Sequence, residues 1–454
     1  MWVALPESVF GRSKTPLAVG LTAAGLLWPG GGRLHADEAA DFRRQMELLT
    51  QQNALLQQQV QLQEKTIAAL SNRVSAVEQT SAPHDQQPDN SKPDVAEVPA
   101  APKTGGFNLG NVNLSGEGGV GVFSSQTDGR YPNTDFRVIE ARLYTEAPIW
   151  ADVYFHGELD LATPENDDFQ AELGELYLDF ENISQLWGSD GMLSVRAGRL
   201  DIPFGEEYQT RNAIDNPLIL NSISDLWGID AGVELYGVLG KFSYVAAVQN
   251  GGYQVTDGQG DKAVAVRLGW DPANWLHLSV SGMRTGNLSV QNDLWSALWF
   301  GNGWLQSIGG PGTTTFNLNL VEGDLDMTWS RGQIKMLGGY LHYRDNDPAG
   351  NHWRDMYYYS IEGVADVTRK FYTAARFSQV FAHNGYPIPG EGNFDEYYNA
   401  NPTTDLWRLS VGAGYHFSQR LVVKVEYAFE HGTEANGNHR NDEDFIGTEA
   451  AFKF

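Results

Sequence analysis

The chain has 454 residues, of which 41% are hydrophobic, and it carries a formal net charge of −26 with no cysteine. The lack of cysteine excludes disulfide bonds, thiolate metal sites and cysteine nucleophiles. The acidity argues against nucleic-acid binding, because neutralising phosphates requires lysine and arginine. A chain of this length suits either two or three soluble domains or one large barrel.

Residues 1–36 are typical of a secretory signal peptide. Arg12 and Lys14 precede a largely apolar, uncharged run from Thr15 to Trp28, and we expect cleavage after Ala36. A short membrane anchor is the alternative, although the run is short for a helix that spans a bilayer.

Residues 37–80 predict an α-helical coiled coil in the periplasm. Core positions alternate at spacings of four and three from Phe42 to Val77, with polar Asn53 and Gln63 among them. A helix lying on the rest of the protein is the alternative. Residues 81–106 then carry five scattered prolines among polar residues, which predicts a flexible linker.

From Phe107 to Phe454 apolar and polar residues alternate in many segments of the sequence. In 152–161, for example, Phe155 and Leu159 alternate with His156 and Glu158. We identify about 16 such segments, joined alternately by short turns and long loops. This pattern predicts an all-β fold, an antiparallel transmembrane β-barrel in the bacterial outer membrane, surrounded by lipid.

The segment Leu193–Asp225 predicts a specialised loop. An alternating strand stops at Pro203-Phe204-Gly205, and the next strand begins only near Ile229. A loop of this length inside a compact domain usually has a function. We expect this third long loop to fold into the barrel and narrow the lumen.

The run from Val195 to Gly205, Val-Arg-Ala-Gly-Arg-Leu-Asp-Ile-Pro-Phe-Gly, resembles a motif of the phosphate-selective porin O/P family. The resemblance implies a bacterial outer-membrane porin, a barrel of 16 strands, an inward-folded third loop and a homotrimer in which each barrel is a channel. Channels of that family resemble ladders of arginine and lysine that lead to a cationic constriction. Here the loop departs from this pattern, since it offers five acidic residues, with Arg211 as its basic residue: Asp201, Glu206, Glu207, Asp215 and Asp225.

We predict two sets of pore residues from the loop and from the polar strand faces. The constriction set is Arg196, Arg199, Glu206, Glu207, Tyr208, Arg211 and Asp215. The wall set is Glu140, Arg142, Asp152, Tyr154, Glu158, Asp160, Glu175, Tyr177, Asp179 and Glu234. Because rings of acidic residues favour cations, we expect passive diffusion of small hydrophilic solutes and ions with a preference for cations, or weak selectivity.

Alternative functions remain open at this stage. They are an anion- or phosphate-selective porin and a structural barrel that tethers the envelope without a general pore. Gly116–Gly121 matches a dinucleotide-binding pattern, but its position in a strand favours packing over binding. The histidines are scattered and no GxSxG motif occurs, so we expect no metal site, no cofactor and no catalytic site.

Overall fold

The computed structural model describes residues 107–109, 111–165, 169–253, 261–350 and 353–454. The predicted signal peptide (1–36), coiled coil (37–80) and linker (81–106) lie outside these residues. No helix among the described residues is long and apolar enough to cross a membrane.

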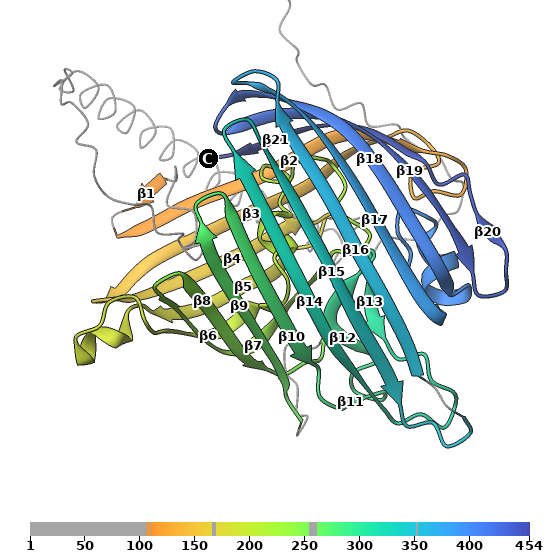
Figure 1. Cartoon of the computed structure of the whole chain (residues 1–454), viewed down its shortest axis with the longest axis horizontal. Coiled ribbons are helices and arrows are strands. Elements are labelled where there is room, and N and C mark those ends of the chain that lie inside the picture. The colour runs from red at the N-terminus through yellow and green to blue at the C-terminus, as the bar shows by residue number, and fades with distance from the viewer. Residues whose placement is uncertain (1–106, 110, 166–168, 254–260, 351–352) are drawn as a thin grey trace, which may run out of the picture. The chain divides into compact units, whose positions relative to one another are not determined.

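The described chain forms a closed antiparallel barrel of 16 strands, which confirms the predicted fold class (Figure 1). Each strand pairs with its neighbour, and β2 closes the barrel by pairing with β21 from Glu117↔Lys453 to Ser125↔Phe445. The barrel strands are β2 (Val112–Ser125), β3 (Asp135–Trp150), β4 (Val153–Ala162), β5 (Glu172–Phe180), β6 (Ser194–Asp201), β7 (Leu226–Leu239), β8 (Phe242–Gln249), β9 (Ala263–Ala273), β10 (Leu276–Arg284), β14 (Thr315–Trp329), β15 (Gly332–Asp345), β16 (Trp353–Asp366), β17 (Phe371–Tyr386), β18 (Thr403–Ser418), β19 (Leu421–Glu434) and β21 (Phe445–Lys453).

Shorter elements decorate this barrel. β1 (Phe107–Leu109) pairs with the start of β2, and β20 (His439–Arg440) pairs with β19. The connection from β10 to β14 contains β11 (Leu288–Ser289), β12 (Trp295–Phe300) and β13 (Gly303–Gln306). The helical turns are η1 (Ile183–Trp187), η2 (Glu207–Thr210) and η3 (Asp395–Ala400).

The strands are apolar outside and largely polar inside. In β19, Val423 and Val425 are exposed, whereas Lys424 and Glu426, which alternate with them, are buried. Side chains alternate between the two faces of a strand, so the same sequence pattern gives the barrel an apolar outer surface and a charged interior. The glycine-rich segment 116–121 lies in β2, as predicted.

The two ends of the barrel differ, as the sequence predicts. We call them the turn end, where the connections are mostly short, and the loop end. Residues 151–152, 240–241 and 330–331 make turns on the same side as the C-terminus. The loop end carries the long connections, including 202–225 between β6 and β7, 285–314 between β10 and β14, and 387–402 between β17 and β18.

The interior is not polar throughout. Near the loop end, the inward residues of β14 are Phe316, Leu318 and Leu320, and all three are buried in one apolar cluster. Phe204 of the β6–β7 loop and Phe300 of β12 join this cluster. The long connections therefore fold against an apolar sector of the inner wall, which stabilises them by removing apolar surface from water.

Gly205 sits where the β6–β7 loop leaves its strand. Its φ of 71° lies in the left-handed region, and a methyl group there would collide with the Glu322 carboxylate. Glu322 is buried and accepts a hydrogen bond from the Tyr358 hydroxyl at 2.8 Å, so it has little room to move. The turn therefore requires glycine on two grounds, backbone conformation and space.

We expect Gly205→Ala to destabilise the barrel more than Gly240→Ala does. Gly240 has a similar φ of 69°, but nothing lies within 4 Å of its missing side chain. In both variants, left-handed strain should lower the free energy of unfolding by about 1–2 kcal/mol. Gly205→Ala should lower it further because of the collision with Glu322. Denaturant unfolding of the two purified variants measures the difference, and equal losses would contradict this account.

Candidate pore and its inner loop

The β6–β7 loop is bonded to the inner wall on the side of β9 and β10. The Gly205 amide donates to Ser281 Oγ at 3.0 Å, and Arg267 Nη1 donates to the Gly205 carbonyl at 2.6 Å. Glu206 forms ion pairs with Arg267 at 3.3 Å and with His277 at 3.4 Å. The entry of the loop is thus held by polar side chains that point inward from two strands.

The same loop is also bonded to β17 and β19. Lys424 Nζ donates to the carbonyls of Ala213, Asn216 and Leu218 at 2.7, 3.2 and 2.8 Å. Arg376 Nη1 donates to the carbonyl of Leu220 at 2.6 Å. Contacts to both sets of strands mean that the loop runs across the inside of the barrel.

The exit of the loop centres on Arg211. Its guanidinium pairs with Glu165 at 2.7 Å and Asp225 at 3.2 Å, and it lies over the Trp227 ring at 4.0 Å. Burial raises the pKa of the Asp225 carboxyl to about 7, with Arg211 opposing the shift. Burial likewise acts on Glu165, but the charge of Arg211 holds the pKa of that carboxyl below its usual value.

Glu206 and Tyr208 lie together at the loop entry. Arg267 donates to the Tyr208 hydroxyl at 3.0 Å as well as pairing with Glu206. Burial alone would raise the pKa of the Glu206 carboxyl, but its hydrogen bond to His277 and the charge of Arg267 hold it below its usual value. Glu206 is therefore a carboxylate at neutral pH.

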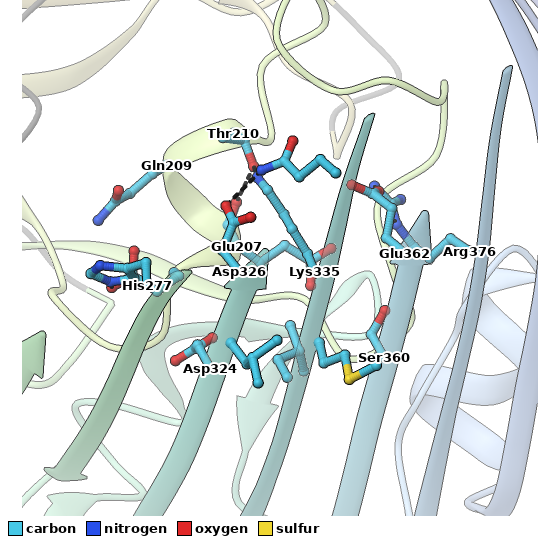
Figure 2. Close-up of a pocket in the computed structure, with 15 residues that line it drawn as sticks. Glu207, Gln209, Thr210, His277, Asp324, Asp326, Lys335, Ser360, Glu362 and Arg376 are labelled. Carbon is cyan, nitrogen blue, oxygen red and sulfur yellow. Dashed lines mark hydrogen bonds and ion pairs between the residues drawn. The ribbon is translucent and has the colours of Figure 1, made fainter. Parts of the chain in front are cut away.

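A cavity of about 280 Å³ separates the loop from the wall formed by β14 to β17. Figure 2 shows Glu207, Gln209 and Thr210 of the loop on one side of it and Asp324 and Ser360 of the wall on the other. Its charged lining comprises five carboxylates, two basic residues and one histidine: Glu206, Glu207, Asp324, Asp326, Glu362, Lys335, Arg376 and His277.

The cavity lining holds more acidic than basic side chains, and the carboxylates are held in different ways. Arg376 forms a close ion pair with Glu362, so these two charges compensate each other. Lys335 donates to Thr210 at 3.2 Å, and Asp326 accepts from Gln333 at 2.6 Å. Asp324 accepts from Ser279 at 3.0 Å.

The wall residues predicted from the sequence lie on the opposite sector, from β3 to β7. Arg142 contacts Glu140, Glu158 and Asp160 at 3.2, 3.6 and 3.4 Å. Arg196 contacts Asp179 at 2.9 Å and Glu234 at 3.3 Å, and it lies over the Tyr236 ring at 4.4 Å. Tyr177, Glu175 and Tyr154 belong to the same face of β4 and β5 as these acids.

Two predicted positions are wrong in detail. The sequence predicts Asp152 on the wall, but it lies exposed in the turn between β3 and β4 with a left-handed φ of 55°. The sequence predicts Arg199 in the constriction, but the register pairs it with outward-facing Leu176, and its Nε donates to the Leu173 and Gly174 carbonyls at 3.2 and 3.1 Å. Arg199 therefore lies on the outer face and does not join Arg196.

The other loop residues are held in different ways. Glu207 accepts hydrogen bonds from the Ser222 amide at 3.0 Å and from its hydroxyl at 2.6 Å. Asp215 is half-exposed and pairs with Lys453 of β21 at 3.5 Å. Asp324, Asp326 and Glu362 were missed as lining residues, although their alternation with apolar residues in β14 and β16 was a usable signal.

Comparison with known proteins identifies the fold. No protein-family model and no curated protein sequence matches the chain. The outer membrane channel DcaP of Acinetobacter baumannii aligns with a TM-score of 0.51 and 12% identity over 77% of this chain and 100% of that chain. A loop L8 deletion mutant of OmpT, an outer membrane protein of Vibrio cholerae, aligns with a TM-score of 0.50 and 13% identity over 76% of this chain and 99% of that chain.

The chain has a porin-like barrel fold. At these identities the likeness concerns the fold alone, and it does not single out the phosphate-selective porin O/P family. The resemblance of the Val195–Gly205 segment to that family stays a prediction.

We expect Lys424→Met to loosen the loop. The substitution removes the donor to three loop carbonyls and leaves Glu449, which Lys424 pairs with at 3.0 Å, without its cation. Breaking a buried pair in this way typically costs about 3–5 kcal/mol. Because the chain has no cysteine, a cysteine at buried Leu218 gives a single reporter, and it should react faster with a water-soluble maleimide in the Lys424→Met background.

Lys370→Met is the matched control for this labelling. Lys370 lies in a turn-end connection, where its ammonium donates to the Phe417 carbonyl at 3.4 Å and lies 5.9 Å from the centre of the Tyr415 ring, both away from the loop. The labelling rate of the Leu218→Cys reporter should stay unchanged in this background. If Lys424→Met gave the same rate as Lys370→Met, the role of Lys424 in holding the loop would be refuted.

Proposed function

We propose that the protein is an outer-membrane porin through which small hydrophilic solutes and ions diffuse passively. The β6–β7 loop forms the constriction, and the passage runs between that loop and the wall of β14 to β17. The single observation that carries this proposal is the cavity at that place, which polar and charged side chains line. We propose a channel rather than an enzyme, because a solved structure of similar fold, DcaP, is described as an outer membrane channel.

We further propose that the passage prefers cations. Apart from the Glu362–Arg376 and Glu206–His277 pairs, the lining carries Glu207, Asp324 and Asp326 against Lys335. In a narrow space with walls of low dielectric constant, this excess raises the local concentration of cations.

The alternative is the anion- or phosphate-selective channel that the family resemblance implies. Arg196 and Arg211, the arginines that would serve it, each contact two carboxylates. Their charge is therefore compensated locally, which weakens the case for an anionic substrate. A homotrimer, also implied by the resemblance, is proposed as the assembly, and cross-linking in native membranes tests it.

The deciding measurement is the zero-current potential of the purified protein in a planar bilayer under a KCl gradient. We expect the zero-current potential to have the sign of a cation-preferring pore, because the lining is acidic. Asp324→Asn combined with Asp326→Asn should reduce the potential toward the unselective value, and Lys335→Gln should increase it.

Asp395→Asn provides the control for charge outside the passage. Asp395 is exposed in η3 on the loop end, so its loss should leave the potential nearly unchanged. An anion-selective potential would overturn the cation preference and favour the phosphate alternative. A correctly folded barrel that carries no current would overturn the porin proposal and favour a structural tether.

A further inference from the structure

A histidine and two carboxylates converge on the inner wall away from the cavity. His156 and Glu158 occupy alternate positions of β4, and Glu175 comes from β5. One potential ligand atom from each of the three lies within 4.8 Å of the others. The pairing of β4 with β5 shifts register between Gly157 and Leu159, which leaves Glu158 at an irregularity of the kind often found beside functional sites.

His156 is buried without a hydrogen bond. Its residue is 6% exposed, and neither Nδ1 nor Nε2 has a hydrogen-bond partner. Nε2 lies 3.8 Å from Glu175 Oε2, and Nδ1 lies 3.8 Å from Glu146 Oε1, both too long for a hydrogen bond. A buried polar group without a hydrogen bond lowers the stability of the fold, so a bound ligand that satisfies His156 would recover this free energy.

Neighbouring groups fix the orientation of the three side chains. The His156 ring stacks on Tyr177, with ring centroids 4.9 Å apart and planes at 23°. Glu175 Oε1 accepts from the Asp201 amide at 3.0 Å, which leaves Oε2 directed toward His156. Glu158 Oε2 accepts from the Glu175 amide at 3.3 Å.

The donor set is the one that first-row divalent metals accept. Imidazole and carboxylate both bind Zn²⁺, with bonds of about 2.0–2.2 Å. Two ligands of a tetrahedral cation with such bonds lie roughly 3.4 Å apart. The separation of 3.8 Å between Nε2 and Oε2 is a few tenths of an ångström longer, so a small adjustment lets both atoms bind one cation. Glu146 on the far side of the ring matches the carboxylate that commonly accepts from the second nitrogen of a metal-bound histidine.

We propose that His156, Glu158 and Glu175 form a binding site for a first-row divalent cation on the inner wall. Two further carboxyl groups, Asp160 and Asp201, lie near the two glutamates. The nearby cations are Arg142, at 3.6 Å from Glu158, and Arg196, which lies over the Tyr177 ring at 5.3 Å. The rival account is that His156 packs between Glu146 and Glu175 with no metal. The site is independent of the proposed pore, and binding can be measured without conduction.

Isothermal titration calorimetry with Zn²⁺ tests this proposal. The sample is the untagged full-length protein in detergent, stripped of metal with EDTA. We expect one site per chain that His156→Gln weakens more than about 100-fold, beyond the range of outer-partner substitutions. Glu175→Gln should weaken binding strongly, and Glu146→Gln should weaken it by about 10–100-fold, as expected for an outer partner. Heat-modifiable migration on gels confirms that each variant has folded.

His416→Gln is the matched control, because His416 lies exposed near the turn end of β18. The His416→Gln variant should bind zinc at the His156 site as tightly as the wild type does. Zinc binding that is equally strong in wild type and His156→Gln, or absent from the wild type, would overturn the proposal and leave the metal-free account. Binding weakened equally by His416→Gln would also overturn it, since that outcome indicates surface histidines.

Discussion

A chain segment folded into a barrel must find partners for its backbone groups, because little water remains beside a packed wall. The β6–β7 loop has few backbone hydrogen bonds of its own to offer. Charged side chains of the wall supply the partners: Lys424 donates to three loop carbonyls, and Glu426 accepts from the Ile219 and Leu220 amides at 2.5 and 2.9 Å. The position of the loop depends on these contacts.

These buried charges are stable because each serves two partners. Lys424 bonds to loop carbonyls and also pairs with Glu449, and Arg376 bonds to the loop and pairs with Glu362. A lone ion in this environment would lose several kcal/mol of hydration, roughly what a counter-charge with good hydrogen bonds returns. The wall charges on the β17–β19 side are therefore used to hold the loop, and the cavity opens on the β14–β17 side where the loop is less tightly bonded.

The sequence was sufficient for the architecture because the signals are local. Alternation defines strands, the lengths of connections define the two ends, and Pro203-Phe204-Gly205 marks the start of the inner loop. The face of Arg199 depended on register with β5, and the displacement of Asp152 depended on a left-handed turn, so neither was readable from alternation alone. Which wall the loop faces is a tertiary property, and the cavity residues of β14 to β16 were missed for that reason. His156 and Glu158, two residues apart on one strand face, form a pattern that differs from the helical HExxH zinc motif.

The net charge of the chain is a poor guide to the charge that a permeating ion meets. Glu426 is occupied by loop amides, Glu165 by Arg211, and Asp179 by Arg196. Such carboxylates are fixed by their partners, and their fields are largely cancelled at a distance. Asp324 and Asp326 differ. Asp326 accepts from Gln333 and Thr328, and Asp324 accepts from Ser279 and lies beside the Glu322 carboxyl, so none of these hydrogen-bond partners carries a positive charge. In the proposed channel, we expect the small set of acids with neutral partners, rather than the formal charge of −26, to set the field in the passage and the proposed preference for cations.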